Sequence, residues 1–229
     1  MEHFVKRGTL RRWRIVPFWL MGLLSLAACG RSDPFSDNFL QLYATPNPAH
    51  ANFFECHGYG CTFVSRVALS DAEWQSVRAI FTPPATTAKD ERRQIDAALV
   101  RLRLMVGART GTSAHQFTRA NYRILGNPQL DPSQLDCIDE AVNTWTYLTM
   151  MAEDGLLQQH RVERLAYAGG LPDFDFDQRN TAVIQEIANG RFFAIDPTLV
   201  DVGEPPPIFP LSVWLGHWPP PMPATDDVN

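Results

Sequence analysis

The chain has 229 residues, of which 20 are basic and 25 acidic, and 45% of them are hydrophobic. This length and apolar content are sufficient for one domain with a buried core. The net charge of −5 argues against nucleic acid as a partner, because phosphate binding needs an excess of clustered positive charge.

The first 28 residues have the order of parts of a secretory signal. A segment with five Lys and Arg residues precedes the apolar run IVPFWLMGLLSLAA, which is too short to span a bilayer comfortably. Cys29 follows directly. Removal of residues 1–28 takes away those five basic residues and Glu2, so 15 basic and 24 acidic residues remain and the net charge becomes −9.

The sequence LAAC at residues 26–29 resembles the lipobox of bacterial lipoproteins. This resemblance implies a signal peptide over 1–28, attachment of lipid (palmitate and related chains) to Cys29, and a membrane-anchored protein that faces the periplasm. In that family Gly30 fits sorting to the outer membrane rather than retention in the inner membrane. The alternative is an ordinary cleaved signal in which Cys29 is incidental.

The remaining cysteines are Cys56, Cys61 and Cys137. Cys56 and Cys61 enclose HGYG, whose glycines permit a tight turn, and the periplasm is oxidising, so we expect these two to form a disulfide. A zinc site built from Cys56, His57 and Cys61 is the alternative, although the sequence offers no second ligand pair at zinc-finger spacing. Cys137 is left as a single thiol.

The chain after the anchor begins with a polar, Pro- and Asn-containing stretch, which we predict to be a tether over 29–50. The β-branched run at 62–69 predicts a strand, and Ser70 with Glu73 forms a capping-box pattern that predicts a helix over 70–81. Apolar residues at helical spacing predict a core-packing helix over 88–110.

A second amphipathic helix is predicted from Ile138, with Gly155 as its C-terminal stop. A strand candidate follows at 161–168, and two β-prone runs at 181–187 and 192–196 flank Asn189-Gly190, which predicts a hairpin. Between them Asp173, Asp175 and Asp177 alternate like the start of a calcium loop, but the glycine and glutamate that such a loop requires are missing.

The C-terminal stretch GEPPPIFPLSVWLGHWPPPMPATDDVN is rich in proline. We predict an extended arm anchored by Trp214 and Trp218, with a disordered tail over 216–229. Recognition of this stretch by an aromatic groove is the alternative, since such segments form polyproline helices. The folded domain is thereby expected to span 51–215.

Cys137 stands at the predicted start of the second amphipathic helix. Asp136 is a good N-cap and Asp139 is spaced for a capping box, so Cys137 would lie in the first turn, where unpaired N–H groups favour a thiolate and could stabilise an oxyanion. The two adjacent carboxylates act in the opposite direction and raise the thiol pKa.

A helix that begins with cysteine, followed by a strand and a hairpin that ends in aspartate, resembles the transglutaminase-like branch of the papain-like cysteine enzymes. The resemblance covers roughly 130–200 and implies an α+β fold in which the core helix packs on an antiparallel sheet. It also implies that Cys137 is the nucleophile and that Asp196 orients the base. The family's histidine should open the strand at 181–187, where this chain has Arg179 or Asn180.

Arginine stays protonated and cannot accept the thiol proton. Four other histidines were therefore considered as the base: His57 and His115 in loops, His217 near the C-terminus, and His160. A helix of about five turns separates its ends by about 25 Å, which would place His160 far from Cys137.

Two functions are compatible with these residues. The first is a non-catalytic descendant of the fold that binds a peptide or an envelope protein. The second is an active thiol hydrolase or acyl-transferase that acts on peptides or amides. Neither requires a cofactor or a metal, and the sequence shows no phosphate-binding loop, dinucleotide fingerprint or zincin motif.

Overall fold

The computed structural model describes residues 34–116, 131–169 and 178–216. Several predictions from sequence lie outside the described residues: the signal peptide and Cys29, the run Asp173, Asp175 and Asp177, the histidine His217, and the tail with Trp218.

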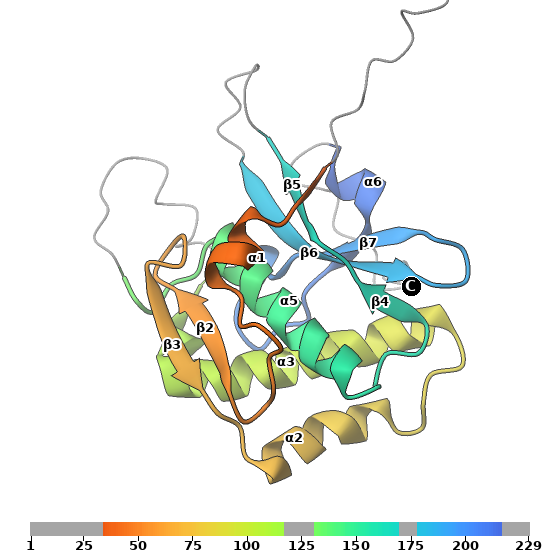
Figure 1. Cartoon of the computed structure of the whole chain (residues 1–229), viewed down its shortest axis with the longest axis horizontal. Helices are drawn as coiled ribbons and strands as arrows, with labels where there is room; N and C mark the ends of the chain where they lie inside the picture. The colour runs from red at the N-terminus through yellow and green to blue at the C-terminus, as the bar shows by residue number, and fades with distance from the viewer. Residues whose placement is uncertain (1–33, 117–130, 170–177, 217–229) are drawn as a thin grey trace, which may run out of the picture. The chain divides into compact units, whose positions relative to one another are not determined.

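Helices and strands are interleaved along the chain (Figure 1). In chain order the elements are β1 (Phe35–Ser36), α1 (Asn38–Tyr43), β2 (Phe53–His57), β3 (Phe63–Val67), α2 (Asp71–Arg78), the 3-10 turn η1 (Ala79–Phe81), α3 (Ala88–Thr110), the turn η2 (Thr112–Ala114), α5 (Cys137–Glu153), β4 (His160–Val162), β5 (Leu165–Ala168), β6 (Arg179–Glu186), β7 (Phe192–Ile195), the turn η4 (Pro197–Leu199), β8 (Ile208–Pro210) and α6 (Leu211–Trp214).

The main sheet has six strands in the order β1-β5-β6-β7-β8, and β4 pairs with the second half of β6. Every pairing is antiparallel. β6 is the central strand: it pairs with β5 at Ala166↔Thr181 and with β7 at Ala182↔Ile195. The hairpin β2–β3 forms a separate two-stranded sheet. The α+β class predicted from the sequence is therefore confirmed.

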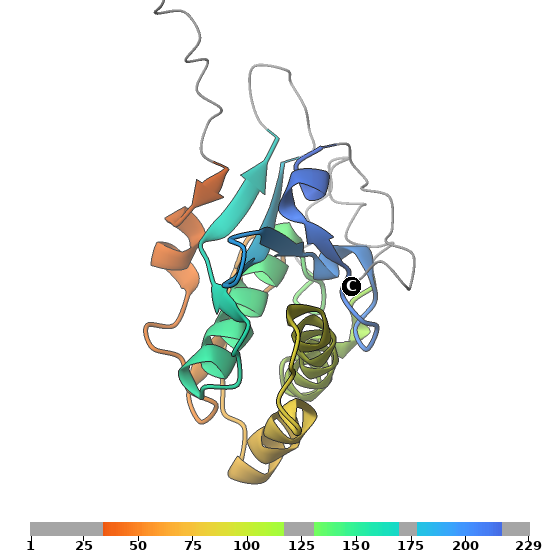
Figure 2. The same ribbon diagram turned by 90° about the vertical axis from the view of Figure 1, so that its right-hand side faces the viewer.

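The core lies mainly on one face of this sheet. α5 packs against that face, and α3 packs in turn against α5 (Figures 1 and 2). The short helix α6 covers the opposite face with a smaller cluster. Side chains of the larger cluster that are fully buried include Phe53, Ile95, Leu99, Leu102, Leu148, Met151, Leu165 and Ile184.

The helix predictions are confirmed, and the reasons are local. Ser70 and Glu73 form the reciprocal capping box at the start of α2. Thr87 caps α3, and Gly111 ends it in the left-handed conformation at φ 84°. None of the helices in the described part of the chain is both long enough and apolar enough to cross a membrane.

The predicted tether is too long. Residues 34–50 pack on the domain: β1 pairs with β5, and Leu40 and Tyr43 of α1 pack against the main core. The backbone N–H of Tyr167 also donates to the Pro34 carbonyl at 2.7 Å. The polar composition of this stretch suggested a tether, but a few apolar side chains, including Leu40 and Tyr43, pack against the core and hold the stretch on the domain.

The predicted strand at 161–168 is two strands, β4 and β5, which pair with different halves of β6. The predicted C-terminal arm is also more regular than expected: β8 extends the sheet, and α6 follows it. Trp214 anchors this segment as predicted, with no exposed surface.

Candidate functional site at the start of α5

Cys137 is the first residue of α5. The carboxylate of Asp136 accepts from the N–H groups of Ile138 at 3.0 Å and Asp139 at 3.1 Å, and Asp139 accepts from the Asp136 N–H in return. The predicted capping box is therefore present. Because Asp136 uses two of the N–H groups at the helix start, they are not available to bind an oxyanion.

The Cys137 sulfur has two polar neighbours. It lies 3.6 Å from the backbone carbonyl of Gln178, to which the S–H donates, and 3.9 Å from the side-chain nitrogen of Asn180. Gln178 directly precedes β6 and Asn180 is the second residue of that strand, on which α5 packs. The strand alternates its side chains between the two faces of the sheet, and Asn180 shares the α5 face with Ala182 and Ile184.

Arg179 faces the other way. Its guanidinium donates to the carbonyl of Trp214 at 2.8 Å and to that of Gly216 at 3.3 Å, and it lies over the Trp214 ring at 4.9 Å. Of the two residues predicted for the base position, the structure brings Asn180 and not Arg179 to the sulfur. The placement of Arg179 at that position is thereby corrected, because a shift of one residue along a strand exchanges the two faces.

Asp196 follows β7 and is buried, with 1% of its surface exposed. One carboxylate oxygen accepts from the backbone N–H and the hydroxyl of Thr198, and the other accepts from the indole N–H of Trp214 at 2.7 Å. Asp196 thus holds the turn η4 and the α6 tryptophan. Burial raises its pKa, although these three donors act to lower it.

Each described histidine that was considered as a base is bound elsewhere. The ring of His57 bonds the Pro132 carbonyl and the Ser65 hydroxyl, and Nδ1 of His115 accepts from the Leu135 N–H. His160, in β4, forms part of a buried polar network with Glu91 and Arg92. His50, which the sequence analysis overlooked, bonds Asp71 and stacks on Trp74.

His160 joins α3 to β4. Its Nδ1 lies 2.9 Å from the Glu91 carboxylate, and its Nε2 lies 3.1 Å from the Arg92 guanidinium, which also pairs with Glu186. Because Arg92 can only donate, Nε2 must be the acceptor and Nδ1 must carry the proton. Both ring nitrogens are therefore engaged within the core.

The environment of Cys137 disfavours the thiolate. Burial raises the thiol pKa to about 12, and the negative charge of Asp136 acts in the same direction. The Asn180 hydrogen bonds lower the pKa but do not offset these effects. The charge of Asp196 also raises it, so the carboxylate that the resemblance assigns to the base acts here on the thiol directly.

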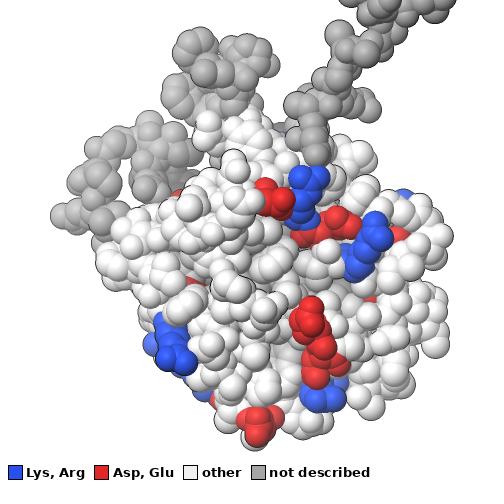
Figure 3. All heavy atoms as spheres, viewed as in Figure 1, with Lys and Arg blue, Asp and Glu red and all other residues white. Residues whose placement is uncertain are grey.

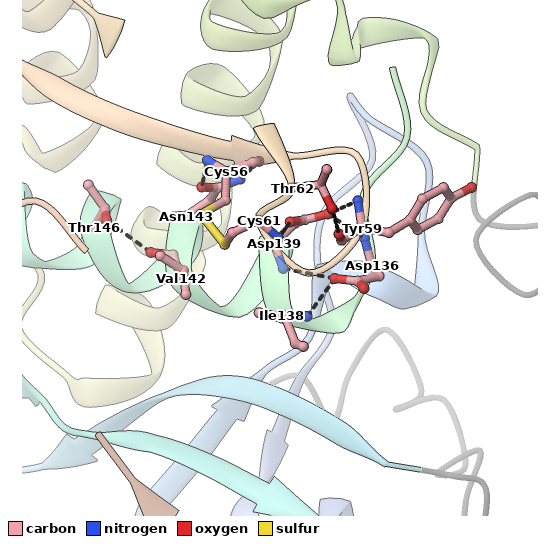
Figure 4. The surroundings of a disulfide bond; sticks show 10 residues. All are labelled: Cys56, Tyr59, Cys61, Thr62, Asp136, Ile138, Asp139, Val142, Asn143 and Thr146. Atoms are coloured by element: carbon pink, nitrogen blue, oxygen red, sulfur yellow. Dashed lines mark hydrogen bonds between the residues drawn. A yellow bond between two sulfur atoms is a disulfide. The ribbon is translucent and has the colours of Figure 1, made fainter. Parts of the chain in front are cut away.

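A disulfide joins Cys56 and Cys61, as predicted. The loop it closes is tied to α5 through Asp139 and Asn143 (Figure 4). The Asn143 amide bonds both the N–H and the carbonyl of Cys56 at 2.8 Å, and the Asp139 carboxylate accepts from the N–H groups of Tyr59 at 2.8 Å and Cys61 at 2.6 Å. Burial raises the Asp139 pKa to about 8.

Gln178 and Asn143 could not be identified from the sequence, because each contact joins a side chain to a backbone group distant in the chain. Gln178 supplies its own carbonyl to Cys137, and the Asn143 amide bonds the backbone of Cys56. A carbonyl that receives an S–H bond leaves no signature in the residue type that carries it.

Comparison with protein-family models, curated proteins and solved structures finds no match to this chain.

Proposed function

We propose that this chain is a lipoprotein, anchored through Cys29 and facing the periplasm, whose domain has a transglutaminase-like fold and binds a peptide or an envelope protein without catalysis. The fold assignment is supported by the order of parts: a core helix that begins with Cys137, then β6, then β7 with Asp196 directly after it.

The proposal that the domain is non-catalytic depends on one observation: the side chain next to the Cys137 sulfur is Asn180. A cysteine nucleophile needs a neighbouring base to remove its proton. Asn180 presents an amide nitrogen there, which donates and has no lone pair to accept a proton. The S–H instead donates to the Gln178 carbonyl, which is an arrangement that retains the proton on sulfur.

An active thiol hydrolase or acyl-transferase is the second candidate. It is favoured by the position of Cys137 at the helix start, where the dipole favours negative charge. In the described part of the chain no hydrogen bond engages the Cys137 N–H, so one donor for an oxyanion is still available. Among the four histidines named as candidate bases, His217 is the one that lies outside the described residues, and it is the candidate to test.

Alkylation of Cys137 distinguishes the two. In full-length protein with the disulfide intact and Cys29 replaced by serine, iodoacetamide can react only with Cys137. The binding-module proposal expects slow reaction at pH 7, with a rate that rises about tenfold per pH unit up to pH 10, because only the thiolate reacts.

A rate that is already high and constant between pH 6 and 8 would contradict the proposal and support the enzyme. The matched variant is His217→Ala: if this histidine supplies the base, the substitution abolishes the fast reaction. If the wild-type reaction is slow and His217→Ala leaves its pH profile unchanged, the non-catalytic proposal stands.

A further inference from the structure

The disulfide loop contains three groups that can bind a metal ion. The sulfurs of Cys56 and Cys61 and a carboxylate oxygen of Asp139 lie within 4.8 Å of one another (Figure 4). All three side chains are buried, and Asp139 has no exposed surface. Residues from a hairpin and from a helix about 80 positions later in the chain are thus brought to one point.

The backbone of the loop makes this convergence. Gly58, Tyr59, Gly60 and Cys61 all have positive φ, between 52° and 78°, so the chain turns back on itself within four residues. The glycines adopt this conformation without steric cost. Four residues separate the two cysteines in the sequence, and this C-x4-C spacing lies within the range of structural zinc sites.

The zinc alternative considered from the sequence used His57 as the third ligand. The structure excludes His57 in its present orientation, because its ring nitrogens face the Pro132 carbonyl and the Ser65 hydroxyl. Asp139 takes its place as the third group. The hydrogen bonds of Asn143 to the backbone of Cys56 hold the disulfide loop against α5 one turn from Asp139.

The Asp139 carboxylate keeps one acceptor site at which a cation could bind. Its oxygens accept three backbone N–H groups, from Tyr59, Cys61 and Asp136. In the described residues no Lys, Arg or His forms an ion pair with it. A carboxylate offers about four acceptor sites, so one remains, on the oxygen that faces Cys61. A carboxylate oxygen with a remaining acceptor site beside two sulfurs is a ligand that zinc accepts.

We propose that the reduced protein binds one Zn²⁺ through Cys56, Cys61 and Asp139, with water as the fourth ligand. A dithiol reductant passes two electrons and two protons to the disulfide, which yields two thiols and the disulfide of the reductant. Zn²⁺ then replaces the two thiol protons, which pass to solvent. Tetrahedral zinc requires ligand atoms about 3.5–3.8 Å apart. The two sulfurs are bonded to each other in the disulfide and therefore have to move apart on reduction, whereas the Asp139 oxygen already lies within 4.8 Å of both.

The disulfide and the zinc site exclude each other, because both use the same two sulfurs. The proposal is independent of any role of Cys137, and so it can fail without affecting the proposed binding function. It adds a metal-bound form, available wherever the chain meets a dithiol reductant before or after export.

Cobalt titration tests the site. The full chain, with Cys29→Ser and Cys137→Ser so that only Cys56 and Cys61 carry thiols, is reduced with dithiothreitol and desalted under inert gas. We expect one Co²⁺ per chain, a near-ultraviolet thiolate-to-cobalt band, visible bands of tetrahedral cobalt, and displacement by one equivalent of Zn²⁺. The oxidised protein should show none of these.

Two variants identify the third ligand. Asp139→Asn should weaken Co²⁺ binding at least tenfold at the same thiol count, whereas His57→Ala should leave the affinity unchanged. The absence of a thiolate band in reduced protein with two titrated thiols would overturn the proposal. Loss of affinity in His57→Ala would also overturn it, and that measurement decides the matter even if Asp139→Asn does not fold.

Discussion

Asn180 differs from histidine in the one property that governs Cys137. Its amide nitrogen lies 3.9 Å from the sulfur and can only donate, whereas a neutral imidazole at the same place could accept the thiol proton. The side-chain amide oxygen of Asn180 is buried and has no hydrogen-bond partner in the described residues. A substitution of Asn180 therefore leaves no donor unpaired that this oxygen now satisfies.

Replacement of Asn180 by histidine should activate the thiol. Imidazole next to the sulfur stabilises a thiolate–imidazolium pair, so the alkylation rate at pH 7 should rise at least tenfold. Asn180→Ala is the matched control, and it should leave the rate within about twofold, as should Arg179→His on the opposite face. Equal activation by Arg179→His would mean that the two faces of β6 are assigned the wrong way round.

Asp96 on α3 provides a pH test of stability. Burial raises its pKa to about 7 from an ordinary value of 3.8, and one of its oxygens is buried without a hydrogen-bond partner. Because the folded chain holds this proton more tightly than the unfolded chain, the stability contribution of Asp96 falls as pH rises from about 4 to 7.

Asp96→Asn should therefore stabilise the fold at high pH. The full shift corresponds to about 4 kcal/mol, and partial exposure reduces the expected gain to about 1–2 kcal/mol at pH 8, with little effect at pH 4. Urea unfolding at both pH values measures it. A gain of the same size at both would show that the charge of Asp96 is not the cause.

At the scale of elements, the helices α2, α3 and α5 could be predicted from the sequence, whereas the short helices α1 and α6 and the contacts between elements could not. The capping residues Ser70 and Asp136 mark their helices because the cap is made by groups a few residues apart. The bidentate bond from Asn143 to Cys56 spans 87 positions, and nothing in the spacing of polar residues on a helix announces it.

The candidate site shows the same limit. The sequence predicted that Cys137 opens a helix, which is found, and a strand over 181–187, which in the structure is β6 and begins two residues earlier, at Arg179. It could not decide which of Arg179 and Asn180 faces α5, since that choice depends on a strand boundary known only to within a residue or two. The packing of Ala182 and Ile184 against α5 fixes the phase of the strand.

Asn143→Ala tests how far α5 depends on the hairpin β2–β3. The change removes two buried hydrogen bonds and leaves the N–H and carbonyl of Cys56 without partners, so unfolding with the disulfide intact should require about 2–4 kcal/mol less free energy. Ser70→Ala, which removes an exposed cap of α2, should cost only about 1 kcal/mol. Equal losses would mean that the link between α5 and the hairpin contributes no more than a surface cap.

At the scale of the whole molecule, the surface charge and the distance to the proposed lipid anchor limit which partners the domain can reach. On the face shown in Figure 3, acidic and basic side chains lie in small mixed groups and do not form a continuous basic surface. β1 enters the main sheet at residue 35, so if Cys29 carries lipid, only five residues separate the anchor from the folded domain. A tether this short restricts the domain to within about 20 Å of the bilayer surface.

Cys29→Ser tests that attachment in the full chain. Lipid would be attached through the side chain of Cys29, so the variant cannot carry an acyl chain. Metabolic labelling with palmitate should mark the wild type and not the variant. Cys137→Ser is the matched control, because it also removes a single thiol and should leave the labelling unchanged. Palmitate labelling of Cys29→Ser, or the absence of labelling in the wild type, would show that the lipobox prediction fails.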